Sequence, residues 1–198
     1  MSGSPIDFYY DVSSPYSYLA ACRADELAER TGRPVRWRAF LLGGVFKLAQ
    51  NTMPAASPAK AAYLLDDLKR EAARIGVPFN FHPDFPVNSL HLQRACLAAE
   101  RRDPALGEAV ARELFRAMWV DNVAQLDISG FGAAIARAGA DPNDLFAAAQ
   151  EPSNKEALKA VTSEAVSRGC FGAPSFLVDG ALFWGHDRID QLVSFLAD

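Results

Sequence analysis

The chain has 198 residues and a formal net charge of −4 at pH 7, with 50% hydrophobic and 22% charged residues. This length predicts one domain, or one domain that carries an insertion, and the composition is that of a globular protein with a sizeable core. The acidic balance argues against nucleic acid or an anionic membrane as the main partner. No apolar run reaches the ~18 residues of a membrane-spanning helix, and the N-terminal stretch is unlike a signal peptide, so we expect a cytoplasmic location.

The beginning of the chain predicts a strand, a tight turn and a helix. The apolar run from Ile6 to Val12 is typical of a strand. Ser14 is a helix-start signal because a hydroxyl residue caps the first turn and the following proline fits its first position. The helix is expected from Pro15 to about Arg30, and Arg23 lies close to its apolar stripe, so this charge needs water or a partner. The unpaired N–H groups and partial positive charge at the helix start favour an anion beside the Ser14 hydroxyl.

The rest of the chain predicts a sheet interrupted by helices. Val35 to Leu42 alternates enough to be a strand, and a strand, a helix and a strand within about 40 residues indicate a parallel pair. From Gly43 to about Arg168 the apolar spacing is helical, whereas Asp179-Gly180 is a hairpin signal between two short strands. The expected helices are Ala59–Ile75, Leu90–Arg101, Pro104–Val120, Ser129–Ala138, Asp144–Ala149, Asn154–Arg168 and a last one from Asp187, and the late strands are Pro174–Val178 and Ala181–Trp184.

This order of elements predicts an α/β protein with a thioredoxin-like fold and a helical insertion. Residues 1–42 and 169–198 would form the thioredoxin-like domain, and residues 43–168 the insertion. The three cysteines, Cys22, Cys96 and Cys170, are odd in number and far apart, which argues against a disulfide framework or a zinc site. They lie in apolar segments, so we expect inert buried thiols and no bound metal.

Four segments spread over nearly the whole chain resemble one known family. They are DFYYDVSSPYSYLA at residues 7–20, GVFK with the following Asn51, KAAYLLDDLKR at residues 60–70 and FGAPSFLVDGALFWGHDR at residues 171–188. The sequence is similar to the 2-hydroxychromene-2-carboxylate isomerases, which are kin of the kappa-class glutathione transferases and of the DsbA-type oxidoreductases. The resemblance implies a DsbA-like or kappa-like thioredoxin fold, glutathione as the cofactor and a homodimer.

The helix start carries a serine where oxidoreductases of this fold carry the first cysteine of C-x-x-C. Here the four positions read Ser14, Pro15, Tyr16 and Ser17. A serine hydroxyl does not ionise at neutral pH and forms no disulfide, so dithiol exchange is lost. The resemblance implies that Ser14 instead stabilises the thiolate of bound glutathione, whose thiol has an unperturbed pKa of about 8.5. The alternative is a plain N-cap, and the two roles are compatible.

The resemblance also implies which other residues form the site. The loop at Ala173-Pro174 resembles the cis-proline loop of the family, although a trans proline at a strand start is the alternative. Asp187 is expected to bind the γ-glutamyl end, or simply to cap the last helix. His186 is expected to be a solvated cap residue rather than a catalyst, and Trp119 a core residue rather than part of an aromatic pocket. The implied glutathione contacts are Ala173, Pro174, Trp184, Gly185, His186, Asp187, Asn51 and Lys60, and the implied substrate contacts are Lys47, Tyr16, Phe85 and Asn88.

The function that the resemblance implies is isomerisation of 2-hydroxychromene-2-carboxylate or a similar aromatic pyruvate by reversible addition of the glutathione thiolate. The alternative is a kappa-type glutathione transferase that acts on another electrophile. A dithiol oxidoreductase is a further alternative, which the missing C-x-x-C argues against. The last alternative is a non-catalytic thioredoxin-like binding module, which would not bind glutathione.

Overall fold

The computed structural model describes residues 3–53, 57–123 and 128–197, and these form a four-stranded sheet at the centre of the protein. The strand order is β2-β1-β3-β4, with β1 at Ile6–Tyr10, β2 at Val35–Ala39, β3 at Ser175–Val178 and β4 at Ala181–Trp184. β1 runs parallel to β2 and antiparallel to β3, so the first and last parts of the chain share one sheet. The predicted parallel pair and thioredoxin-like α/β fold are therefore confirmed.

The hairpin between β3 and β4 turns where the sequence predicts it. Asp179 and Gly180 have φ angles of +49° and +83°. Two successive positive φ angles belong to the turn that matches the twist of a tight hairpin, and Asp-Gly adopts them readily. This turn brings Trp184, at the end of β4, opposite Ser175, at the start of β3.

Between β2 and β3 the described residues form helices, as predicted. Several begin with proline in the first turn, where its missing N–H costs nothing. The helix α3, which follows β2 directly, was not predicted, because Gly43 and Gly44 disfavour a helix interior. The helices are α3 at Leu42–Leu48, α4 at Pro58–Ile75, α5 at Leu90–Arg102, α6 at Pro104–Trp119, α7 at Ile128–Arg137, α8 at Pro142–Gln150 and α9 at Pro152–Ser167.

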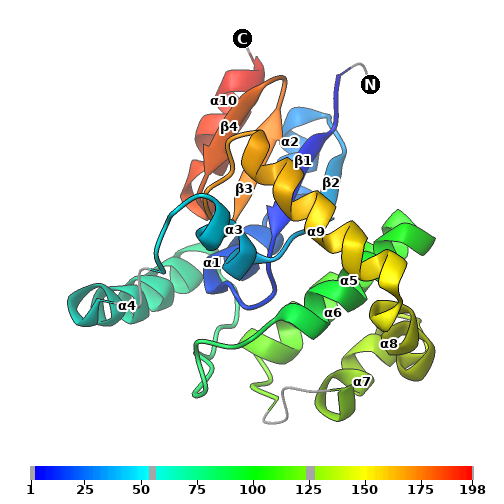
Figure 1. The fold of residues 1–198 in the computed structure, drawn as a ribbon. Helices are drawn as coiled ribbons and strands as arrows, with labels where there is room; N and C mark the ends of the chain where they lie inside the picture. The colour runs from blue at the N-terminus through cyan, green and yellow to red at the C-terminus, as the bar shows by residue number, and fades with distance from the viewer. Residues whose placement is uncertain (1–2, 54–56, 124–127, 198) are drawn as a thin grey trace.

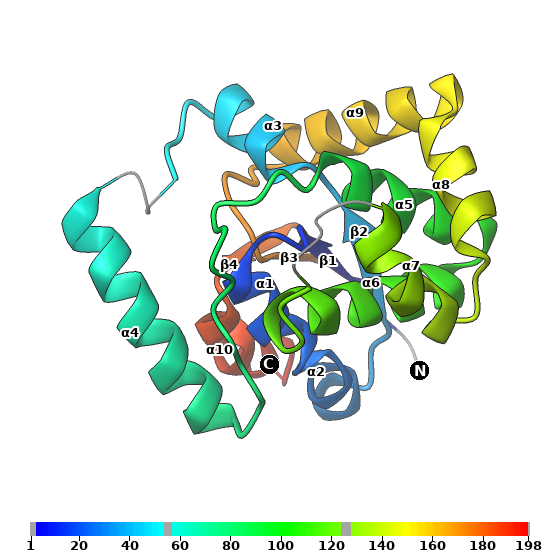
Figure 2. The ribbon, with the colours of Figure 1, turned by 90° about the horizontal axis from the view of Figure 1, so that it is seen from below.

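Two layers of helices cover the sheet, and the insertion extends beyond it (Figures 1 and 2). On one face α3 and α9 enclose a cluster that includes Tyr9, Phe40 and Leu177. On the other face Phe8 and Phe176 belong to the main core, together with α1 at Pro15–Ala21, α2 at Ala24–Thr31 and the C-terminal helix α10 at Ile189–Ala197. Both views show α4 standing out from the body. No helix of the described residues is long and apolar enough to cross a membrane.

The predicted first helix is two helices rather than one. α1 covers Pro15–Ala21 and α2 covers Ala24–Thr31, with the break at Cys22 and Arg23. This break leaves Cys22 exposed, so the prediction of a buried thiol is wrong there, whereas Cys96 and Cys170 are buried as expected.

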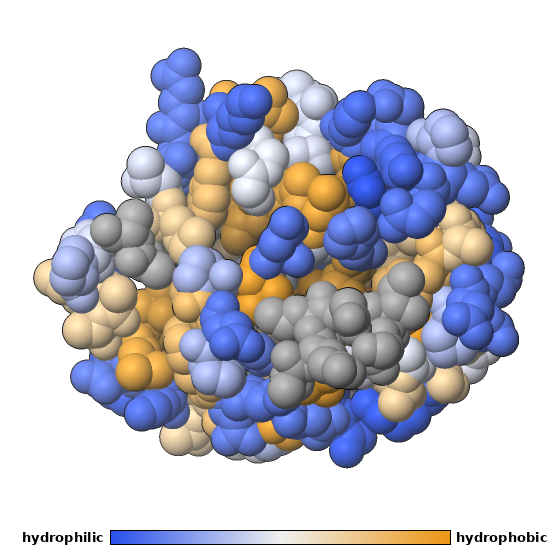
Figure 3. Space-filling view, turned by 60° about the horizontal axis from the view of Figure 1, so that its bottom comes forward, coloured by the Kyte–Doolittle hydropathy of each residue, from blue (hydrophilic) through white to orange (hydrophobic). Residues whose placement is uncertain are grey.

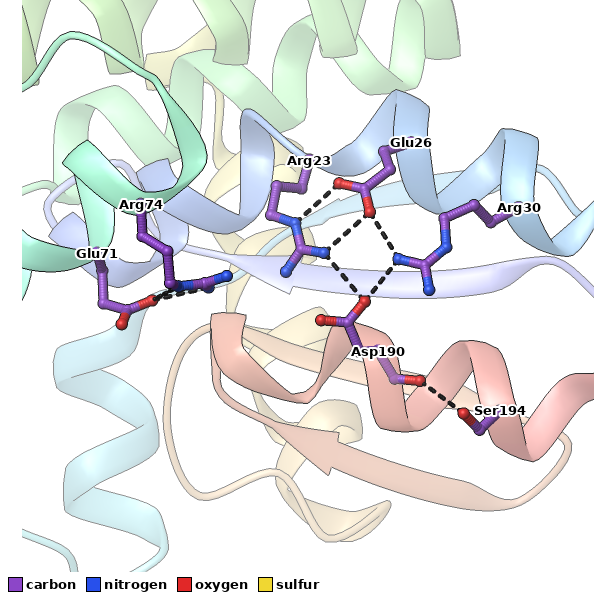
Figure 4. A network of polar contacts seen from close by, with 7 residues as sticks. All are labelled: Arg23, Glu26, Arg30, Glu71, Arg74, Asp190 and Ser194. Atoms are coloured by element: carbon purple, nitrogen blue, oxygen red, sulfur yellow. Dashed lines mark hydrogen bonds and ion pairs between the residues drawn. The ribbon is translucent and has the colours of Figure 1, made fainter.

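Arg23 finds acidic partners for two of its three guanidinium nitrogens, whereas Nη1 is buried without a hydrogen-bond partner among the described residues. Its side chain is only 8% exposed and donates two hydrogen bonds of 2.9 Å to Glu26. It also reaches Asp190 at the start of α10 at 3.3 Å. Arg30 donates hydrogen bonds to the same two acidic residues, Glu26 and Asp190 (Figure 4). The charge network therefore ties α2 to the C-terminal helix.

An Arg23→Met variant is expected to lose about 1–3 kcal/mol of unfolding free energy at pH 7, because charge-assisted hydrogen bonds are lost. The hydrogen bond from Arg23 is the main cause that lowers the pKa of Glu26 to about 2. A lowered pKa stabilises the fold above the unfolded value of about 4.3, and this stabilisation is lost as the pH falls through the folded value. The deficit of the variant should therefore shrink between about pH 4.5 and 2, as urea unfolding at several pH values measures.

The matched control is Lys159→Met. Lys159 and Glu156 form an ion pair whose side chains are 70% and 69% exposed. Such a pair contributes about 0–1 kcal/mol, so little change in stability is expected. Equal losses in the two variants, or a loss in Arg23→Met that does not depend on pH, would contradict the role given to Arg23.

Candidate active site

A cavity of about 850 Å³ lies beside the turn between β1 and α1. Its walls come from this turn, α3, α4, the segment before α5, and the loop that enters β3. On the face that Figure 3 shows, apolar residues gather near the centre, with hydrophilic residues beside them and along much of the margin. The expected site residues that line the cavity are Ser14, Tyr16, Asn51, Lys60, Phe85, Asn88, Ala173 and Trp184, and those that do not are Lys47, Pro174, Gly185, His186 and Asp187.

Ser14 caps α1, as predicted. Its Oγ accepts a hydrogen bond of 3.1 Å from the backbone N–H of Ser17, and Pro15 occupies the first turn. The residue is 5% exposed, and its nearest acceptor is the carbonyl of Ala173 at 3.5 Å, at the outer limit of a hydrogen bond. Because the cap uses only a lone pair of the oxygen, the hydroxyl proton remains available to an anion in the cavity.

The loop opposite Ser14 presents backbone polar groups to the cavity. The Ala173–Pro174 peptide bond is cis, as the resemblance implies. The N–H of Ala173 has no hydrogen-bond partner among the described residues, and its carbonyl has only the long contact to Ser14. A donor and an acceptor on one residue can pair with an extended peptide, as two strands do.

Trp184 packs against this loop because Gly172 leaves room for it. A Cβ atom on Gly172 would lie 2.6 Å from the indole nitrogen of Trp184. The indole is 46% exposed and contacts the ring of Phe171 at a centroid distance of 4.8 Å. An aromatic pair of this kind can stack on a planar ligand.

Tyr16 connects the helix start to α4. Its hydroxyl donates a hydrogen bond of 2.7 Å to Asp67 on α4, and its ring stacks on His186 at 5.2 Å. Burial, followed by the bond to Asp67, raises the pKa of Tyr16. The hydroxyl proton is therefore committed to Asp67, and it is the ring that remains for a substrate.

His186 does not have the solvated position that the sequence predicts. The residue is 4% exposed, and burial lowers its pKa, which favours the neutral ring. Its Nε2 lies 3.9 Å from Glu71 on α4. Asp187 is half-exposed and pairs with Arg188 at 3.5 Å. The prediction failed for His186 because the stacking partner, Tyr16, is remote in the sequence.

The two lysines differ in position. Lys60, near the start of α4, is the only charged side chain among the described residues that line the cavity. Lys47 is exposed on α3 and does not line the cavity. Lysine side chains are long and flexible, so the placement of Lys60 makes it the better candidate for a carboxylate ligand, and Lys47 stays a prediction.

The remaining expected contacts are partly engaged within the protein. The amide of Asn51 donates to the carbonyl of Phe171 at 2.9 Å and accepts from Thr52 at 2.8 Å. Asn88 accepts from the backbone N–H of Leu90 at 3.1 Å. Phe85 precedes a second cis proline, which the sequence did not suggest, and its ring contacts Trp119 at 6.1 Å. Trp119 itself is fully buried, so its interpretation as a core residue is confirmed.

Two polar residues that support the site were not singled out in the sequence. Gln93 on α5 is fully buried and accepts from the N–H of Val12, while its amide donates to the carbonyls of Tyr10 and Phe40. Asp11, at the end of β1, is fully buried as well. The available signal was a polar residue within an apolar stretch, which needs a partner when it is buried.

No group of three or more His, Cys, Asp or Glu side chains in the described chain is arranged to hold a metal ion.

The family model described as "DSBA-like thioredoxin domain" matches residues 5–197. A 2-hydroxychromene-2-carboxylate isomerase from Sphingobium xenophagum is 31% identical over 98% of this chain and 98% of its own. The kappa 1 glutathione S-transferase of Homo sapiens is 29% identical over 98% of this chain and 91% of its own.

A solved structure of a 2-hydroxychromene-2-carboxylate isomerase superposes with a TM-score of 0.87 at 27% identity, covering 98% of this chain and 95% of the other. These matches extend over the sheet, the insertion and the cavity alike. The chain therefore belongs to the DsbA-like thioredoxin family, in the group that contains the 2-hydroxychromene-2-carboxylate isomerases.

Proposed function

We propose that this protein is a glutathione-dependent isomerase of 2-hydroxychromene-2-carboxylate or a similar aromatic pyruvate. The observation that carries the proposal is Ser14, a buried hydroxyl at a helix start that lines an apolar cavity and donates only through the long 3.5 Å contact to the carbonyl of Ala173. The similarity to isomerases over nearly the whole chain supports the same reaction class. Glutathione, when bound, would supply a thiolate nucleophile.

The backbone and side chains around Ser14 fit glutathione. The unpaired N–H of Ala173 and its carbonyl, which has only the long contact to Ser14, match a peptide unit. Lys60 offers a cation for a carboxylate in the cavity. His186 and Asp187 do not line the cavity, but they follow the lining residue Trp184 closely in the chain, and their backbone N–H groups have no partner among the described residues. A cavity of this volume lies within the range of about 300–1,000 Å³ that is usual for small-molecule sites.

The residues that line the cavity would each have a separate role in the reaction. The Ser14 hydroxyl donates a hydrogen bond to the sulfur and favours its negative charge. Lys60 attracts the carboxylate of the substrate. The rings of Tyr16, Phe85 and Trp184 contact the aromatic part of the substrate, and the apolar walls exclude water, which strengthens both electrostatic interactions.

The direct test is an isomerase assay with purified protein and 2-hydroxychromene-2-carboxylate, with glutathione present or omitted. We expect turnover only with glutathione, and none with S-methylglutathione, which has the same peptide groups but no free thiol. Turnover that does not depend on glutathione would contradict the proposal. A homodimer and a cytoplasmic location, which the resemblance implies, stay predictions.

A kappa-type glutathione transferase is the second candidate, because kappa-class enzymes are also 29% identical to this chain. The same protein should be assayed with a chromogenic aryl halide. Conjugation of the halide without isomerisation of the chromene would favour this alternative.

A further inference from the structure

One buried carboxylate holds three walls of the cavity together. Asp11 is fully buried at the end of β1. Its Oδ1 accepts from the N–H and the hydroxyl of Ser13 at 2.9 and 2.8 Å. Its Oδ2 accepts from the N–H of Leu42 at 2.8 Å and from the hydroxyl of Ser89 at 2.9 Å. Four donors occupy the four lone-pair positions of the carboxylate.

These partners lie at the places where the cavity is formed. Ser13 precedes the Ser14 cap, Leu42 begins α3, and Ser89 precedes α5. All of these residues line the cavity. The backbone carbonyl of Asp11 also accepts from the N–H of Ser14 at 2.9 Å. The position of the Ser14 hydroxyl relative to the two helices therefore depends on one side chain.

The hydrogen bonds favour the ionised form of Asp11. Burial raises its pKa, and the four donors oppose that rise because each one stabilises the carboxylate. Two of the donors are backbone N–H groups, which cannot reverse and accept from a protonated acid. Tyr10 on β1 and Cys96 on α5 are the titratable groups nearby, and burial raises the pKa of each, that of Cys96 to about 12, so both are neutral at pH 7.

We propose that Asp11 is a positioning residue that stays ionised: it fixes the Ser14 turn to α3 and α5, and its negative charge opposes the ionisation of a thiol held at Ser14. The inference rests on the proposed function, since that thiol is glutathione's. The reversible addition of the glutathione thiol would explain why a negative charge lies close to the place where the thiol binds. A thiolate that is stabilised too strongly is a poor nucleophile, and the best attacking thiol has a pKa close to the ambient pH. Asp11 would keep the helix start from lowering the thiol pKa beyond that point.

The charge effect can be measured without glutathione by placing a thiol at the site. In a Ser14→Cys background, the pKa of the introduced thiol is obtained from the pH dependence of iodoacetamide alkylation, resolved by mass spectrometry because Cys22 is also exposed. Adding Asp11→Asn removes the charge. We expect the thiol pKa to fall by about one unit, as for the loss of a nearby like charge. An unchanged or raised pKa would overturn the inference.

The Ser89→Ala variant, made in the same Ser14→Cys background, separates the effect of the Asp11 charge from the effect of a loosened turn. The Ser89 hydroxyl donates to Asp11 and does not cap its own helix, so the variant loses one hydrogen bond to the carboxylate and keeps the charge. We expect the thiol pKa not to fall. A fall equal to that of Asp11→Asn would mean that a loosened turn, not the charge, is responsible.

The wild-type protein offers a readout that needs no stable Asp11 variant. The ¹³C chemical shift of the Asp11 carboxyl group at pH 7 reports its ionisation, and the shift of a carboxylate is expected. The shift of a protonated acid would overturn the inference. Isothermal titration with glutathione is independent of these results: failure to bind glutathione would contradict the proposed function while leaving the thiol measurement valid.

Discussion

A Ser14→Ala variant is expected to lose about 10²–10³ in kcat at pH 7, the usual cost of removing one hydrogen-bond donor to a reacting anion. The hydroxyl of Ser14 lies at the start of α1, and the one acceptor that it has among the described residues is the carbonyl of Ala173, 3.5 Å away. Without that donor the negative charge on the sulfur is less stable, so a smaller fraction of the bound thiol is ionised at neutral pH.

The pH dependence of activity shows in which direction the loss of the Ser14 hydroxyl shifts the thiol pKa. Removing a donor to the thiolate raises the thiol pKa toward the unperturbed value of about 8.5. Activity of the variant should therefore rise with pH up to and beyond that value, and the deficit relative to wild type should be smaller at pH 9 than at pH 6. The pH dependence of kcat, together with the absorbance of the thiolate near 240 nm, measures both. Profiles that run parallel at all pH values would contradict the role of Ser14.

Ser17→Ala is the matched control for this experiment. The Ser17 hydroxyl is buried one turn further along α1 and has no hydrogen-bond partner among the described residues. Ser17→Ala removes the same atom, a serine Oγ, from the same helix but away from the cap, so we expect little change in the pH profile. Ser14→Ala also removes the N-cap, which costs about 0.5–2 kcal/mol of stability, so thermal unfolding of both variants should be recorded.

The local signals in the sequence were sufficient to predict the main elements of the fold. Ser14 with Pro15, and Asp179 with Gly180, act through their own backbone preferences, so the helix start and the hairpin occur where predicted. The α3 helix was missed because propensity opposes it at Gly43 and Gly44, and tertiary packing against α9 outweighs propensity.

The candidate site was predictable only where it rests on such local signals. Which lysine lines the cavity depends on how α3 and α4 are rotated about their axes, and this favours Lys60 over Lys47. The burial of His186 depends on Tyr16, about 170 residues away in the chain. Contacts of this kind come from the assembled fold, and no period or turn signal in the sequence encodes them.

A Gln93→Leu variant is expected to lose about 3–5 kcal/mol of unfolding free energy, the largest stability effect that we predict. The side chain of Gln93 joins α5 to the ends of both parallel strands. It accepts from the N–H of Val12 at 3.2 Å and donates to the carbonyls of Tyr10 and Phe40, each at 2.8 Å. Leucine has a similar volume but no polar atoms, so three backbone groups that Gln93 pairs would lose this partner.

Gln150→Leu is the matched control, because Gln150 is exposed and its side chain makes one hydrogen bond within the described part of the chain, to the exposed His91 at 3.2 Å. We expect a change within about 0.5 kcal/mol there, as for most surface substitutions. Urea unfolding with a common m-value gives both numbers. Val12 leads directly into the turn that carries Ser14, so Gln93→Leu should also lower activity in the fraction that remains folded. A stability loss below about 1 kcal/mol would mean that water or a shifted backbone satisfies these groups, and that α5 does not hold the strand ends in place.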